Sequence, residues 1–151
     1  MKREIKNKTK IVNQLNSLLS NYEMYYQNLR ALHWNIKGNM FFMLHAKYEE
    51  MYNEASEVID EIAERILTLG ETPSHTFEDF IKNSSVKAVK NVTDTSESLR
   101  IVLANQELIL EKTYEVNDIA SDSGDEGTVA MLSEIISQLE KSIWMFKASK
   151  A

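Results

Sequence analysis

Two histidines lie on either side of a turn signal, at positions from which both could bind the same metal ion. His33 precedes Gly38-Asn39 by five residues, and His45 follows it by six. If the two flanking segments are antiparallel helices, both imidazoles lie at one height on the wall of a helical bundle. Imidazole nitrogens and carboxylate oxygens together form a ligand set that suits iron. The spacing therefore predicts a metal-binding pair beside this turn.

Candidate carboxylate ligands follow on the second of these segments. Glu49 lies one helical turn beyond His45, and Asp60 and Glu64 form an i, i+4 pair further along. His45 and Asp60 are fifteen residues apart, which corresponds to about 22 Å along one helix. The ligands of one ion must converge on it, so these two residues cannot share a site within one chain.

A site shared between two copies of the chain removes this difficulty. Two copies of the second helix can pack antiparallel about a twofold axis near residues 52–55. The two histidines of one copy then face Asp60 and Glu64 of the other, and the symmetry creates two equivalent sites. Iron sites inside a single four-helix bundle use Glu-x-x-His motifs, and this sequence contains none. The sequence thus favours an intersubunit site in a homo-oligomer.

The elements that carry these residues are predicted to be long helices. Only four Gly and one Pro occur in 151 residues, which disfavours many short strands. Apolar residues recur at steps of three and four, the pattern of amphipathic helices, over 11–36, 41–69, 99–119 and 129–146. Residues 70–94 hold the only Pro and are expected to form a long crossover containing a short helix. The expected fold is all-α, a four-helix bundle with ferritin-like connectivity.

Composition narrows the classes of function. The absence of Cys excludes disulfides and thiolate metal sites. The basic N-terminus lacks the apolar segment of a signal peptide, and no stretch approaches the length of a membrane span. We therefore expect a cytoplasmic protein with no membrane contact. The net charge of −6 suits the attraction of cations and disfavours DNA along the whole surface.

The motif residues resemble those of the DNA-protection-during-starvation (Dps) family of miniferritins. The two histidines and two acidic residues of this sequence have the spacing of that family's ferroxidase ligands, His-x11-His-x14-Asp-x3-Glu. The resemblance extends from about Leu15 to Phe146. The segments that carry it are His33-Trp34-Asn35-Ile36-Lys37-Gly38, Phe41-Phe42-Met43-Leu44-His45, Asp60-Glu61-Ile62-Ala63-Glu64-Arg65-Ile66, Leu69-Gly70 and Trp144-Met145-Phe146. We therefore expect residues 11–151 to form a ferritin-like four-helix domain, preceded by a basic extension over residues 1–10.

The resemblance implies a hollow dodecamer that oxidises Fe²⁺, with hydrogen peroxide as the oxidant, and stores ferric mineral. Its ferroxidase site would lie across a twofold interface. His33 and His45 would be ligands from one subunit, with Glu64 the principal carboxylate of the other and Asp60 a ligand or a partner of one. Glu49 would be a further metal ligand, at a place where members of that family usually have Asp, and its side chain is one methylene longer. Trp34 would lie beside the iron and intercept oxidising equivalents, in a protein that protects the cell from oxidative stress.

The candidate site residues also have simpler interpretations, without a catalytic role. Either histidine alone is typical of an ordinary core or surface position, and Trp34 could be a packed aromatic. Asp60 and Glu64 could be solvated or paired with neighbours such as Arg65. The same ligands could also hold zinc in a metal-binding scaffold without turnover.

An acidic cluster lies near the last predicted turn of the chain. It consists of Asp118, Asp122, Asp125 and Glu126. One interpretation is a solvated region that caps helices. The other is an acidic pore at a threefold axis that draws in Fe²⁺.

The basic N-terminal run is the one feature that favours DNA as a partner. It comprises Lys2, Arg3, Lys6, Lys8 and Lys10. Repeated around a shell, a basic arm could bind phosphates by avidity. The alternative function is accordingly a DNA-coating nucleoid protein with a secondary or vestigial metal site. Against it, the same residues could simply form the exposed first turns of a helix.

Overall fold

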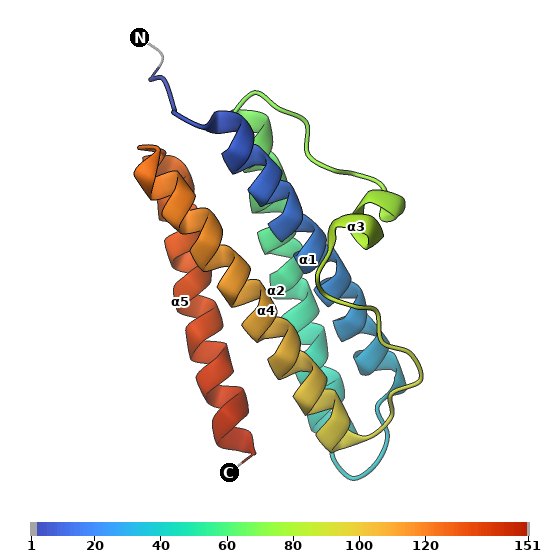
Figure 1. Cartoon of the computed structure of the whole chain (residues 1–151). Coiled ribbons are helices and arrows are strands. Elements are labelled where there is room, and N and C mark those ends of the chain that lie inside the picture. Colours follow the sequence, from blue (N-terminus) through green and yellow to red (C-terminus); the bar gives the residue numbers. More distant parts are fainter. Residues whose placement is uncertain (1–2, 151) are drawn as a thin grey trace.

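The computed structural model of the chain describes residues 3–150, and four long helices form its bundle. They are α1 (Lys8–Asn35), α2 (Phe41–Thr68), α4 (Thr95–Asp122) and α5 (Glu126–Ser149), and the short α3 (Phe77–Asn83) lies in the connection between α2 and α4. Figure 1 shows α3 on the outer side of α1, away from α5. The predicted all-α bundle with a long, helix-containing crossover is confirmed. In the described part of the chain, no helix is long and apolar enough to span a bilayer.

The first two helices form the antiparallel hairpin expected from the turn signal. The hairpin turn begins when the backbone of Ile36 leaves the helical region, and its N–H donates to Leu32 O. Gly38 has a φ of 111°, a conformation that residues with a Cβ rarely adopt. Its carbonyl accepts the N–H of Phe41 at 3.1 Å, where α2 begins. Glycine is therefore needed at the turn that sets the register of the hairpin.

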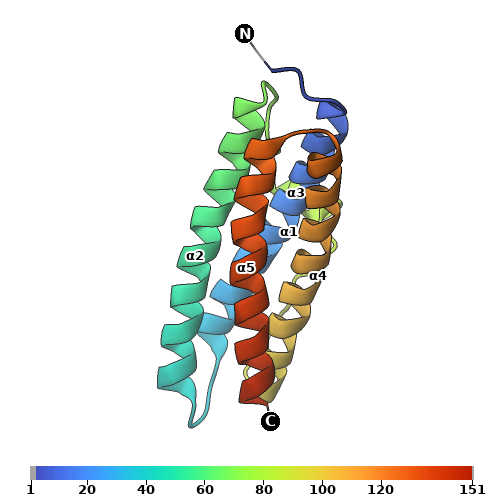
Figure 2. The same cartoon turned by 90° about the vertical axis from the view of Figure 1, so that its left-hand side faces the viewer.

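The crossover returns along α1, so α4 begins at the same end of the bundle as α2 (Figures 1 and 2). Two buried asparagines on α1 hold it. Asn21 Oδ1 accepts the backbone N–H of Ser85 at 2.7 Å. Asn28 Oδ1 accepts the N–H of Val89 at 3.1 Å, and its amide donates to a crossover carbonyl at 2.9 Å. Each buried amide satisfies backbone groups that have no helical partner.

Apolar side chains fill the space between the helices in the predicted stripes. Fully buried members come from all four long helices: Leu15, Leu29, Ile62, Ile66, Ile109 and Leu132. Burial of each such side chain stabilises the fold by about 1.5–3 kcal/mol. Side-chain caps define where the later helices begin. Asp94 accepts the N–H of Glu97 at 2.9 Å at the start of α4, a contact typical of an N-cap aspartate.

The end of the bundle opposite the α1–α2 turn is held by an internal ion pair. Arg65 on α2 donates to Asp125 at 2.7 Å and to Thr128 Oγ1 at 2.9 Å. Asp125 also caps α5 by accepting the N–H of Thr128. A Cβ on Gly127 would lie 2.7 Å from an Arg65 nitrogen, so a side chain at this position would have to displace the guanidinium. We call these residues the α2–α5 clamp.

Candidate metal site

His33 and His45 lie in contact at the hairpin turn, at the equal height that their spacing predicted. The ring centroids are 3.8 Å apart and the planes differ by 11°. His33 Nδ1 lies 2.6 Å from the carbonyl oxygen of His45, and His45 Nδ1 lies 2.8 Å from the carbonyl oxygen of His33. A carbonyl oxygen can only accept, so each Nδ1 carries the hydrogen. In the neutral rings, each Nε2 therefore keeps a lone pair available to a metal ion.

Aromatic neighbours fix the orientation of these rings. Phe41 stacks on His45 with a centroid distance of 4.8 Å. The edge of Tyr52 meets His33 at 5.3 Å and 80°. His33 itself is 6% exposed, and His45 is half-buried. Packing and reciprocal hydrogen bonds thus hold the two imidazoles before any ligand binds, which lowers the conformational cost of binding.

Trp34 follows His33 in α1 and lies on the surface of the chain. It is 56% exposed, and the guanidinium of Arg30 lies 4.8 Å from its ring. Arg30 also lies over the ring of Tyr26, at 5.2 Å. Within a single chain, Trp34 packs against Arg30 and more than half of the side chain faces outward.

The carboxylates that sequence analysis proposed lie elsewhere along α2. Glu49 is exposed one turn beyond His45, where the Tyr52 hydroxyl donates to it at 3.4 Å. Asp60 and Glu64 are both exposed further along the helix. Within residues 3–150, neither of these two forms an ion pair. The suggested pairing with Arg65 does not occur, because Arg65 binds Asp125 instead.

The candidate ligands of each chain therefore form two separate groups, which we name as candidate half-sites. The imidazole half-site is His33 and His45, and the carboxylate half-site is Asp60 and Glu64. Across the described residues, no group of three or more His, Asp or Glu side chains is close enough to hold a metal ion. The distance along α2 explains this, because fifteen residues of helix span about 22 Å.

Glu23 is a further carboxylate near Asp60 that sequence analysis missed. Burial raises the pKa of its carboxyl, and the negative charge of Asp60 raises it further. The sequence did indicate which side of the helix carries Glu23. Steps of three, four and three residues lead from Glu23 through Tyr26 and Arg30 to His33. These steps place Glu23 on the same side of α1 as His33.

The acidic cluster near the α4–α5 turn is smaller than predicted. Asp125 is 1% exposed and caps α5 within the α2–α5 clamp, as the capping interpretation predicted, so its carboxylate is not available to line a pore. Glu126 is exposed and pairs with Arg3 at 3.0 Å, a surface contact of little energetic weight. Only Asp118 and Asp122 remain exposed without an ion pair within the described chain.

The basic N-terminal run is partly ordered by the fold. Lys8 and Lys10 lie in the first turn of α1, as the plainer interpretation predicted. Arg3 faces Glu126, Lys6 is exposed, and Lys2 lies outside the described residues. The boundary predicted after residue 10 thus falls within α1, which begins at Lys8.

Comparison with known proteins agrees with the observed fold. A family profile described as a ferritin-like domain matches residues 12–149. The DNA protection during starvation protein of Porphyromonas gingivalis is 38% identical over 138 residues, covering 91% of this chain and 87% of the relative.

Solved structures give the same result. The Dps protein of Vibrio cholerae O1, described as a member of a broad superfamily of ferritin-like diiron-carboxylate proteins, has a TM-score of 0.94 at 40% identity, covering 95% of this chain and 91% of that one. The Dps protein of Bacillus brevis superimposes with a TM-score of 0.93 at 33% identity over the full length of both chains. This chain therefore belongs to the Dps family of ferritin-like proteins.

Proposed function

We propose that this protein assembles into a hollow homo-oligomeric shell, oxidises Fe²⁺ at sites shared between twofold-related subunits, and stores the ferric product. The observation that carries the proposal is the reciprocal bonding of His33 and His45. Each Nδ1 is engaged by the other residue's carbonyl at 2.6–2.8 Å, so both Nε2 atoms are free. Membership of a ferritin-like family of diiron-carboxylate proteins makes iron the appropriate metal.

The two half-sites have complementary chemistry for a ferrous ion. The Nε2 atoms of His33 and His45 are neutral donors on one subunit, and they add no charge to the site. Asp60 and Glu64 of the twofold-related subunit supply oxygen donors and the negative charge that favours Fe³⁺ over Fe²⁺ after oxidation. Glu49 extends from the imidazole side and completes the set. An acidic protein with a net charge of −6 draws cations toward these ligands.

The reaction that fits this site uses hydrogen peroxide as the oxidant. Two ferrous ions each lose one electron, and one peroxide takes up both electrons and two protons to give two waters. Paired electron transfer releases no hydroxyl radical, so the cell is protected while iron is stored. Trp34 lies beside His33 with Arg30 over its ring at 4.8 Å, where it can donate an electron to any oxidant that escapes pairing.

Anaerobic addition of hydrogen peroxide to the Fe²⁺-loaded protein tests this function. We expect His33→Ala/His45→Ala to slow optically monitored iron oxidation by at least about a hundredfold, because loss of even a group that orients a metal ligand costs about 10–100-fold in metal affinity or activity. His75→Ala is the matched control, since His75 is exposed in the crossover and should leave the rate unchanged. Equal rates in the wild type and the double variant would exclude this site as the place of oxidation.

A further inference from the structure

Tyr52 contacts two of the candidate iron ligands on the imidazole side of the proposed site. The edge of its ring meets His33 at 5.3 Å and 80°, and its hydroxyl donates to Glu49 at 3.4 Å. Hydrogen bonds in a site of this kind are often long before the substrate binds, and they shorten in the loaded site. One half-buried phenol therefore links an imidazole to a carboxylate.

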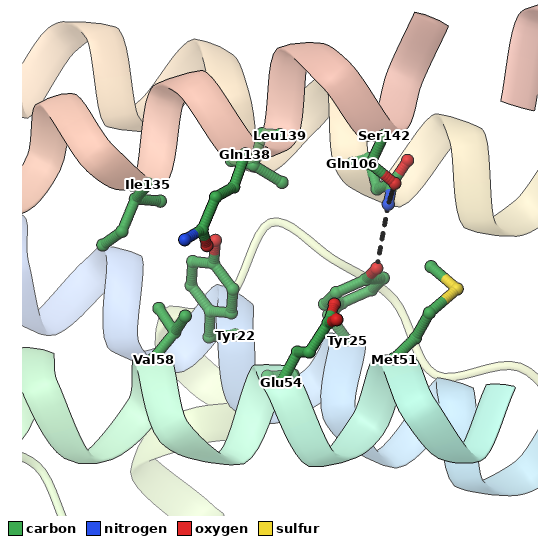
Figure 3. Close-up of a pocket in the computed structure, with 11 residues that line it drawn as sticks. Tyr22, Tyr25, Met51, Glu54, Val58, Gln106, Ile135, Gln138, Leu139 and Ser142 are labelled. Carbon is green, nitrogen blue, oxygen red and sulfur yellow. Dashed lines mark hydrogen bonds between the residues drawn. The ribbon is translucent and has the colours of Figure 1, made fainter. Parts of the chain in front are cut away.

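The hydroxyl partner of Tyr52 distinguishes it from most of the six tyrosines in the sequence. A phenol that loses an electron becomes a strong acid, so it is oxidised most readily where a base can take its proton. Tyr22 and Tyr25 line an internal pocket, where Gln106 donates to Tyr25 Oη at 3.1 Å (Figure 3). The Tyr48 hydroxyl bonds to a buried serine. Amides and serines are poor bases, so these positions do not favour oxidation.

Within the described chain, Tyr52 and Tyr114 are the two tyrosines that donate to a carboxylate. Tyr114 donates to Glu140 at 2.6 Å, between α4 and α5. Ring contacts separate the two phenols. Tyr52 packs on His33, whereas none of the aromatic ring pairs among the described residues includes Tyr114. Of these two, only Tyr52 combines a base for its proton with contact to a candidate iron ligand.

The charge of Arg30 makes Trp34 a weaker electron donor than Tyr52. The guanidinium lies 4.8 Å from the Trp34 ring. Loss of an electron would leave a positive charge on the indole, which the neighbouring cation opposes, and it would also end the attraction that holds Arg30 over the ring. In the described chain no cation lies over the Tyr52 ring. Because Tyr52 can give up its proton together with its electron, no charge builds up on it.

We propose that Tyr52 stores one oxidising equivalent beside the iron, ahead of Trp34, and returns it to a second Fe²⁺; this inference rests on the function proposed above. A site holding a single Fe²⁺ gives peroxide one electron, which breaks the O–O bond into hydroxide and a hydroxyl radical. Tyr52 passes an electron to that radical, which becomes hydroxide, and its proton to Glu49. The next Fe²⁺ reduces the tyrosyl radical, and the proton returns from Glu49. In sum, one peroxide oxidises two ferrous ions and gives two hydroxides.

Freeze-quench electron paramagnetic resonance of the assembled protein tests the proposal, with one Fe²⁺ per site and an equal amount of hydrogen peroxide. Ring-deuterated tyrosine changes the hyperfine pattern of a tyrosyl radical and leaves that of an indole radical unchanged. We expect a tyrosyl signal in the wild type that is retained in Trp34→Phe and lost in Tyr52→Phe, which keeps the ring that packs on His33. Tyr114→Phe is the matched control: it removes the other hydrogen bond from a phenol to a carboxylate and should retain the signal.

Anaerobic addition of more Fe²⁺ tests the return of the stored equivalent. The tyrosyl signal should decay faster with Fe²⁺ than with Zn²⁺, which binds the same kinds of ligand but gives no electron. Iron oxidation is followed optically in the same samples. If iron is oxidised but no tyrosyl radical forms, if the signal survives Tyr52→Phe, or if Fe²⁺ does not hasten its decay, the role of Tyr52 is overturned and the ferroxidase function stands. If the wild type does not oxidise Fe²⁺ with peroxide, both are overturned.

Discussion

The two ends of the α1–α2 hairpin use their polar side chains in opposite ways. At the turn end, the imidazole half-site is held in place by hydrogen bonds through Nδ1, and each Nε2 is left for a ligand from outside the chain. At the other end, Arg65 and Asp125 neutralise each other and cap a helix. Groups whose bonding capacity is used internally stabilise the chain, whereas groups with unused capacity point to a ligand or partner.

The largest change in stability should come from Arg65→Ala. It leaves Asp125 as a buried carboxylate without its counter-ion and should lower the free energy of unfolding by about 3 kcal/mol. The rate of iron oxidation per folded protein should change little, because neither half-site is altered. Urea unfolding followed by circular dichroism measures the first quantity, with Asp122→Ala as an exposed acidic control. A loss below 1 kcal/mol would mean that the clamp is no more than a surface contact.

A smaller effect should follow from Gly127→Ala. The added methyl meets Arg65 nitrogens that two hydrogen bonds hold in place, and overpacking of this kind costs about 1–3 kcal/mol. The same substitution in an Arg65→Ala background should be close to neutral, because the obstructing group is gone. A double-mutant cycle on unfolding free energies measures this coupling. Additive effects would show that Arg65 is not what excludes the side chain.

Glu23→Gln should give the smallest effect, in the direction of greater stability. Burial and Asp60 raise the pKa of the Glu23 carboxyl in the folded chain. The folded state therefore binds its proton more readily than the unfolded state, and the charged form lowers stability at neutral pH. The variant should unfold at a higher temperature than the wild type at pH 7. This difference should shrink as the pH falls through the raised pKa toward the ordinary value for Glu.

Thermal unfolding at pH 7 and near pH 4.5 measures this difference. Glu61→Gln on α2 is a suitable control, because it removes one exposed carboxylate from the neighbouring helix. A destabilised Glu23→Gln at neutral pH would show that the carboxylate is satisfied within the chain, as Asp125 is.

Local spacing was enough to predict the hairpin and the imidazole half-site. Gly38 marks the turn, and the equal distances of His33 and His45 from it give their common height. Tertiary partners were harder to predict. In the sequence, Asp125 is one of several acidic residues near a turn. Only the packing of α2 against α5 shows that Arg65 binds it. Glu23 was missed for the same reason, since its proximity to Asp60 depends on how α1 and α2 pack together.

We propose that each iron site takes its imidazoles and its carboxylates from different subunits. The most direct test co-assembles two inactive variants, His33→Ala/His45→Ala and Asp60→Asn/Glu64→Gln, by unfolding and refolding them as an equal mixture. Half of the twofold contacts would then pair unlike subunits, and each such contact would restore one complete site. We predict that the mixture oxidises Fe²⁺ at about a quarter of the wild-type rate, while each variant assembled alone stays inactive. A mixture as inactive as its components, in particles shown to contain both, would contradict an intersubunit site.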